Sequence, residues 1–135
     1  MKKSEIKNSA DMFLYKAIVD LNSAKYLMKA FSEDKIEIDI EKIYFELQQS
    51  AEKILKSILT KNTIAFPKTH DIEQLLDICK QHQITIVEDS RMLEELVELS
   101  DYAVEGRYSI IHDDVNDSEK YCNIIEQIIK VISNA

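Results

Sequence analysis

The chain has few of the residues that make turns, and it has no long apolar run. It contains one glycine and one proline among 135 residues, whereas sheets and barrels need many turn residues. No apolar run approaches the roughly 20 residues needed to cross a bilayer. Met1 is followed by residues of mixed charge, not by the apolar stretch of a secretory leader. We therefore predict an all-α, cytoplasmic protein that does not contact a membrane.

Cysteine is also scarce, and its placement argues against a disulfide or metal framework. Cys79 and Cys122 fall at apolar positions of expected helices, which is typical of small buried thiols in a reducing compartment. Cys79 and His82 form one Cys-x-x-His pair, but no second pair accompanies it, and a zinc site needs four ligands. We predict no metal and no other cofactor.

The formal net charge is −8, from 25 acidic and 17 basic residues. Broad, nonspecific binding to nucleic acid depends on lysine and arginine replacing counterions along the phosphate backbone. An acidic chain can therefore process RNA only through a locally positive pocket or with a basic partner.

Apolar periodicity predicts four long helices and one short helix in an up-and-down bundle, as one domain over residues 1–135. The final helix has a buried face that extends to Val131 and Ile132. The five helices are expected at about 10–31, 40–61, 70–79 (the short one), 89–104 and 117–132.

Residues suited to capping mark several of the expected helix ends. Asp39 and Thr69 are predicted N-caps of the second and third helices. Gly106 follows the fourth helix where a C-cap residue is expected. Asn116 and Glu119 have the spacing of a capping box at the start of the last helix.

Three polar or β-branched stretches have two interpretations each. Residues 83–87 are β-branched but have no partner strand, so they are an extended linker or a frayed helix start. Gln48, Gln49 and Glu52 form either a polar seam at an interface or a solvated surface. An acidic face on the fourth helix is either solvated or a docking surface for a basic partner. Its members are Glu88, Asp89, Glu94, Glu95, Glu98 and Asp101.

Four segments occur together in an order that resembles a known family. Residues 17–24 read AIVDLNSA, residues 48–56 read QQSAEKILK, residues 66–72 read FPKTHDI, and Arg107-Tyr108 precedes the last helix. These segments resemble the first-helix, second-helix, "PkTHDL" and "RY" elements of the HEPN family. The resemblance extends across nearly the whole chain.

The resemblance implies a helical bundle that dimerises, often with a nucleotidyltransferase of the MNT type as its partner in a toxin–antitoxin pair. It also implies a metal-independent endoribonuclease that carries an arginine, four to six further residues and a histidine. Arg107 and His112 satisfy that spacing here. Asp114 replaces a tyrosine that several relatives have two positions after the histidine, and Ser109 replaces the proline of noncatalytic relatives.

Arg107 and His112 are suitable residue types for cleaving RNA without a metal. An imidazole can exchange protons with the ribose 2′-hydroxyl and the leaving oxygen, and a guanidinium can bind the phosphate in bidentate fashion. On a continuous helix, five residues turn about 140°, so convergence needs an irregular backbone or two subunits. A structural ion pair between Arg107 and Glu105, or an acid of the fourth helix, is the competing interpretation.

Two further side chains have a chemical and a structural interpretation. Tyr108 either stacks on an RNA base as a substrate-binding residue or packs between helices. His70 either takes part in chemistry or caps and packs at a helix start. The leading hypothesis is a HEPN-type homodimer that acts with an MNT nucleotidyltransferase, with ribonuclease activity at Arg107 and His112. The alternative is a noncatalytic dimeric helical module that binds a protein or a nucleotide.

Overall fold

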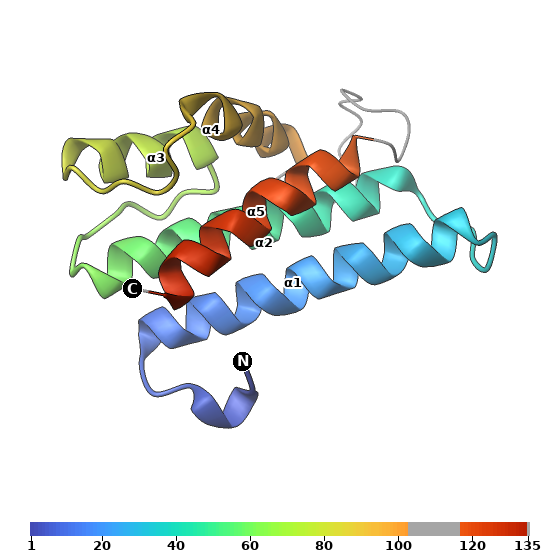
Figure 1. Cartoon of the computed structure of the whole chain (residues 1–135), viewed down its shortest axis with the longest axis horizontal. Coiled ribbons are helices and arrows are strands. Elements are labelled where there is room, and N and C mark those ends of the chain that lie inside the picture. Colours follow the sequence, from blue (N-terminus) through green and yellow to red (C-terminus); the bar gives the residue numbers. More distant parts are fainter. Residues whose placement is uncertain (103–116, 135) are drawn as a thin grey trace.

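A computed structural model describes residues 1–102 and 117–134, and within these ranges the protein is helical with no β-strand (Figure 1). The all-α prediction is therefore confirmed for this part of the chain. The helices are α1 (Ser9–Ser32), α2 (Ile40–Lys61), α3 (Ile72–Gln81), α4 (Ser90–Val97) and α5 (Ser118–Ser133), with 3₁₀ turns η1 (Lys3–Glu5) and η2 (Glu98–Tyr102). None of the helices described is long and apolar enough to cross a membrane.

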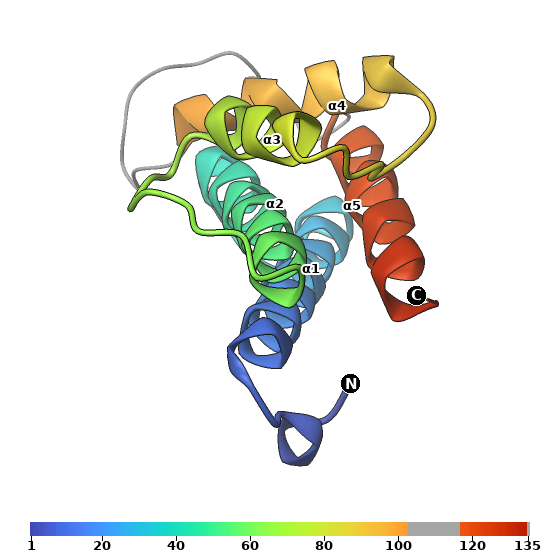
Figure 2. The same cartoon turned by 90° about the vertical axis from the view of Figure 1, so that its left-hand side faces the viewer.

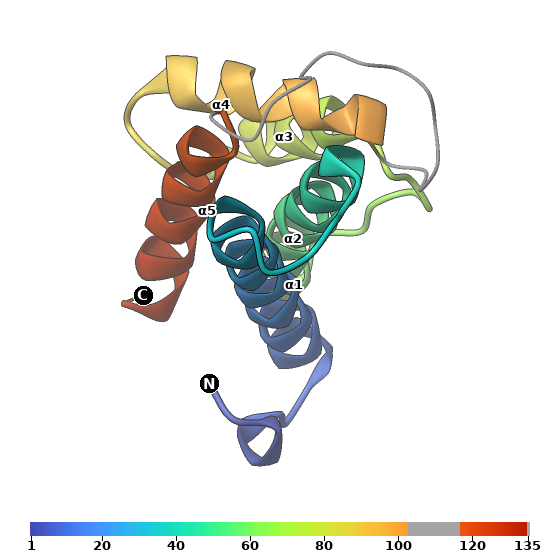
Figure 3. The same cartoon turned by 90° about the vertical axis from the view of Figure 1, so that its right-hand side faces the viewer.

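The three longest helices pack against one another, and the two shorter helices cover α2 and α5. Figure 1 shows α1 and α2 side by side and antiparallel, with α5 alongside them. Figures 2 and 3 show α3 and α4 lying together over α2 and α5, on the side away from α1. The central helix is α2, which packs against every other α-helix or its 3₁₀ extension and has twelve buried residues. This explains the wide apolar face that the sequence shows there.

Small residues allow α1 and α2 to approach closely. Ala17 is fully buried, and its carbonyl accepts a 2.7 Å hydrogen bond from the Ser50 hydroxyl of α2. A second bond of the same kind joins the two helices further along their contact, where the Ser57 hydroxyl donates to the Ala10 carbonyl at 2.8 Å. Hydroxyls that bond across the seam let two polar side chains be buried without an unpaired donor. The seam therefore fixes the register of α1 on α2.

The scarcity of glycine has a visible consequence at the helix ends. Asp34, Thr63 and Gln83 have positive φ angles of 54°, 59° and 59°, directly after the C-caps of α1, α2 and α3. Each end has the two backbone hydrogen bonds of a Schellman motif, such as Ile64 N–H to the Leu59 carbonyl at 2.9 Å. Glycine is the usual residue at this position because it has no Cβ. Here side-chain-bearing residues accept the left-handed conformation.

Some predicted helix ends are confirmed and others are wrong. Asp39 caps α2, as predicted, by accepting from the Glu41 amide. Thr69 does not cap α3: the N-cap is Asp71, whose carboxylate accepts from two amides of the first turn. The Thr69 hydroxyl accepts instead from the Asp71 amide at 3.0 Å and shapes the turn before the helix. Gly106 and Asn116 lie outside the described residues.

The fourth predicted helix, over about 89–104, occurs as α4 followed by the 3₁₀ turn η2. Leu96, Leu99 and Tyr102 are all buried and are three residues apart. A 3₁₀ helix has three residues per turn, so it places side chains at this spacing in line. The tightened backbone therefore keeps one apolar row facing the core. On α5 the predicted face is confirmed except at Val131, which is 45% exposed.

The interpretation of residues 83–87 as a linker is confirmed. They form irregular backbone between α3 and α4, and Ile86 is buried while Ile84 and Val87 pack against the core. The β-branched side chains of this linker pack against the core, and no strand lies beside them in the described ranges.

Candidate functional site

The predicted pair Arg107 and His112, together with Tyr108, lies in residues 103–116, outside the part of the chain that the structure describes. The residues on either side of this segment are placed. Tyr102 stacks on Tyr44 of α2 with ring centroids 5.1 Å apart. Tyr121 of α5 meets the same Tyr44 ring edge-on at 6.1 Å. The elements before and after residues 103–116 are therefore joined to one point of the central helix.

An acid of η2 also joins these two elements. The Tyr121 hydroxyl donates to the Glu98 carboxylate at 2.7 Å. Burial, followed by this carboxylate, raises the pKa of Tyr121 well above its usual range. Glu98 therefore has a structural partner and does not belong to a purely solvated acidic face.

The most elaborate polar arrangement within residues 1–102 and 117–134 surrounds Glu52 of α2. Its side chain is only 5% exposed and accepts from three donors. The Lys56 ammonium lies 2.9 Å from Oε2, and His70 Nδ1 lies 2.8 Å from Oε1. The Gln48 amide donates to the same Oε1 at 3.3 Å. We call Gln48, Glu52, Lys56 and His70 the Glu52 cluster.

The protonation of the cluster follows from its contacts. Burial by itself raises the pKa of Glu52, but the hydrogen bonds from Lys56 and His70 outweigh it and hold the pKa below its usual value of 4.5. An ionised carboxylate can only accept hydrogen bonds. His70 Nδ1 must therefore carry a hydrogen and donate it to Glu52. This leaves Nε2 as the ring nitrogen that can bind or exchange a proton with a ligand.

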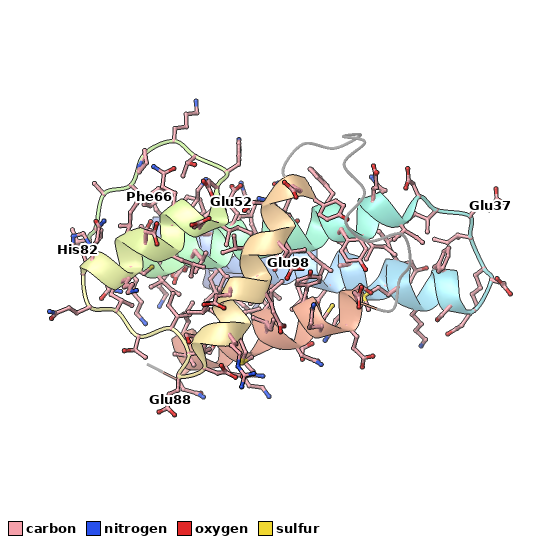
Figure 4. The ribbon with its side chains drawn as sticks, turned by 90° about the horizontal axis from the view of Figure 1, so that it is seen from above. Glu37, Glu52, Phe66, His82, Glu88 and Glu98 are labelled. Atoms are coloured by element: carbon pink, nitrogen blue, oxygen red, sulfur yellow. The ribbon has the colours of Figure 1, made fainter. Side chains whose placement is uncertain are left out.

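The loop before α3 holds the imidazole in place while leaving it accessible. Gln48 donates to the His70 carbonyl at 3.2 Å, so one amide positions both the backbone and the carboxylate partner. Phe66 packs edge-on against Phe13 of α1 at 6.4 Å, and the Lys56 ammonium lies 6.0 Å from the Phe66 ring centre. The His70 side chain is nevertheless 68% exposed. Figure 4 shows Glu52 and Phe66 in the same half of the molecule.

The cluster bears on two interpretations that the sequence leaves open. Gln48 and Glu52 are buried, so a solvated surface is wrong for both, and the seam that they form runs between α2 and the loop carrying His70. His70 does not cap α3, but its ring contacts Glu52 just before the helix begins, and a chemical role for it stays a prediction. The sequence did contain a signal for the burial of Gln48 and Glu52. These two residues lie four and eight residues after Tyr44, which places them on the same face of the helix as the buried apolar residues.

A groove of about 730 Å³ between α3, α4 and their linker is the second feature that can receive a ligand. Apolar side chains including Leu76, Ile84 and Leu93 line it, together with the acidic residues Asp77 and Glu94. Such a groove is within the usual size range of ligand pockets.

No group of three metal-ligating side chains occurs in the ranges that the structure covers. Cys79 is buried, and His82 Nδ1 lies 3.0 Å from the Ile78 carbonyl, which it bonds within its own helix. Cys122 is buried as well, as the sequence predicts.

The chain was compared with family models, curated proteins and solved structures. The model of the HEPN domain matches residues 10–135, which is nearly the whole chain. Neither the curated proteins nor the solved structures gave a match. The family match includes all four segments on which the sequence resemblance rests, as well as the Glu52 cluster. The chain therefore belongs to the HEPN domain family.

Proposed function

We propose that this chain is a single-domain, homodimeric HEPN protein that cleaves RNA without a metal ion and acts with an MNT nucleotidyltransferase in a toxin–antitoxin pair. The HEPN match over residues 10–135 is the observation that carries the proposal. The spacing of Arg107 and His112 within the matched region supports it. The predicted cytoplasmic location is part of the same proposal.

The proposed reaction moves a phosphoryl group from one ribose oxygen to another. An imidazole takes the proton of the 2′-hydroxyl, the 2′-oxygen bonds to phosphorus, and the bond from phosphorus to the 5′-oxygen breaks. The leaving oxygen receives a proton from a second, protonated imidazole. In a dimer, His112 of one subunit and the same residue of the other supply these two roles. Arg107 binds the phosphate oxygens and offsets the charge that develops on them, and Tyr108 stacks on a base.

The test is cleavage of a mixed single-stranded RNA in excess chelator. We expect cleavage by the wild type and a loss of at least about 100-fold in His112→Ala and in Arg107→Ala, since removing a proton-transfer group or an oxyanion donor costs this much. The chain offers matched controls, because its only other arginine is Arg91 and because His82 is an exposed histidine outside the predicted site. Arg91→Ala and His82→Ala should cleave as the wild type does. Cleavage that survives both site substitutions in folded protein would show that the pair is not the active site.

A second candidate function is a noncatalytic module that docks a basic partner. The groove between α3 and α4 supports it, because apolar side chains line it together with Glu73, Asp77 and Glu94, which outnumber the single lysine there, Lys80. A basic amphipathic helix fits such a surface through apolar anchors and flanking lysines. The probe is a synthetic helix of leucine and lysine, followed by amide shifts of α3 and α4. Shifts that Glu94→Lys abolishes, in a protein that does not cleave RNA, would favour this function over the ribonuclease.

A further inference from the structure

The lysines of this acidic chain are unevenly distributed. Residues 53–70 contain four lysines and His70 but no aspartate or glutamate, although acids outnumber bases by eight in the chain as a whole. This stretch runs along the second half of α2 and through the loop to α3. The two neighbouring acids are Glu52, which is buried against Lys56, and Asp71, whose carboxylate accepts from the first turn of α3. The stretch therefore has a local excess of positive charge in the sequence of a negative protein.

Two kinds of lysine occur in this region. Lys53 and Lys56 are bound to carboxylates, at 2.6 Å from Asp20 and 2.9 Å from Glu52. Lys61 and Lys68 are exposed, and neither forms an ion pair with any residue that the structure describes. Lys68 lies two residues before His70 in the same loop. Its charge is available to an anion that approaches the imidazole.

His70 differs from an ordinary surface histidine because its ring is oriented. Glu52 holds Nδ1 at 2.8 Å, while the side chain remains 68% exposed. Because Nδ1 is hydrogen-bonded to Glu52, Nε2 is the ring nitrogen left for a ligand, and an imidazolium donates from both ring nitrogens. Charge-assisted hydrogen bonds from such groups to phosphate oxygens are shorter and stronger than neutral ones. Orientation in advance reduces the entropy lost on binding.

We propose that His70, oriented by Glu52, forms with Lys68 a phosphate-binding subsite for the backbone of single-stranded RNA. The subsite deepens the proposed ribonuclease function, and its identification of RNA as the ligand rests on that function. His70 contacts the phosphate, Lys68 adds a second positive charge, and Glu52 is a positioning residue that acts only through the imidazole. RNA bound here is attached at a stretch of the chain, residues 53–70, that contains no acidic residue of its own.

The test measures binding separately from cleavage. The probe is a fluorescent single-stranded RNA with 2′-O-methyl groups throughout, which cannot be cut by attack of a 2′-hydroxyl. Fluorescence anisotropy at low salt and about pH 6, where histidines ionise readily, should show about fivefold weaker binding for His70→Gln. Lys68→Gln should weaken binding and reduce the slope of log affinity against log salt by about 0.7, the value for one contact to a single strand.

His82→Gln and Lys80→Gln are the matched controls. His82 is also exposed, but its Nδ1 bonds to a backbone carbonyl at 3.0 Å instead of a carboxylate. Figure 4 shows His82 at the left end of the molecule and Glu52 nearer its middle. The controls should bind as the wild type does. Equal effects of the two histidine substitutions, or no binding by the wild type, would overturn the proposal.

The role of Glu52 has its own readout. Long-range proton–nitrogen spectra of the imidazoles should show His70 with its hydrogen on Nδ1 in the neutral form, and Glu52→Gln should change the signals of His70 but not those of His82. A neutral His70 with its hydrogen on Nε2 would contradict the positioning role. If inorganic phosphate shifts the His70 signals while His70→Gln leaves RNA affinity unchanged, the site binds free phosphate and the RNA assignment is wrong.

Failure of the subsite and failure of the ribonuclease give different results. RNA cleavage that needs His112, with binding and cleavage unaffected by His70→Gln, would remove the subsite and leave the ribonuclease. Binding of the methylated RNA through His70, without cleavage of ordinary RNA, would support the subsite and remove the ribonuclease.

Discussion

Substituting Glu52 by glutamine tests whether its carboxylate holds the second half of α2 and the loop to α3 together. The change keeps the shape of the side chain and removes its charge. Lys56 then loses its partner at a position where its side chain is only 12% exposed. Removing one partner of a buried ion pair costs about 3–5 kcal/mol because the other charge stays buried. Lys56 can extend its ammonium toward water, and His70 can still donate to the amide oxygen.

We therefore expect Glu52→Gln to lower the free energy of unfolding by about 2–3 kcal/mol at neutral pH. Urea denaturation followed by circular dichroism measures this loss directly. The melting temperature should fall by about 3–5 °C for each kcal/mol in a chain of this size. The control is Glu33→Gln, which breaks the pair of Glu33 with Lys35, whose side chain is 69% exposed. That substitution should change stability by less than about 0.5 kcal/mol.

The same substitution has a defined dependence on pH. The pKa of Glu52 in the folded protein is below its usual value of 4.5. A depressed folded pKa stabilises the protein above the unfolded pKa, and that stabilisation is lost as the pH falls through the folded value. The difference in stability between the wild type and Glu52→Gln should therefore narrow as the pH falls from about 5 through the lowered pKa of Glu52. A loss below about 1 kcal/mol at neutral pH, or a difference that does not change with pH, would refute the reasoning.

Two further predictions concern backbone strain and buried thiols. Thr63→Gly should stabilise the protein by about 0.5–1 kcal/mol in urea denaturation, because a β-branched residue at a φ of 59° is strained. Glycine removes this strain, and the energy gained exceeds the entropy that glycine adds to the unfolded chain. No gain in stability would show that Thr63 is not strained. Burial raises the pKa of Cys79 and of Cys122 to about 11, so iodoacetamide at about pH 8 should label both only as the protein unfolds. Labelling of folded protein at the rate of a free thiol, measured by mass spectrometry, would contradict that burial.

Local pattern was enough to predict most of the helices. The apolar stripe of α1, the wide face of α2 and the cap at Asp39 are properties of neighbouring residues, so they could be read from spacing alone. The family resemblance could also be read from the sequence, because its segments are short and continuous, and the HEPN match confirms it. The Arg107–His112 site stays a prediction.

Features that depend on distant residues were not predictable in the same way. Sequence alone left His70 with two interpretations, since its partner Glu52 is eighteen residues away and the loop between them has no periodicity. Residues 98–102 form a 3₁₀ turn where the sequence predicts the continuation of an α-helix, and Tyr102 of this turn stacks on Tyr44 of α2, a distant residue. Sequence by itself determined which residues form helices and which face of each is apolar, since both follow from local periodicity. Only the tertiary structure decided that a buried carboxylate, a lysine and an exposed imidazole form one cluster, because the energy of that cluster comes from contacts between segments that the chain brings together when it folds.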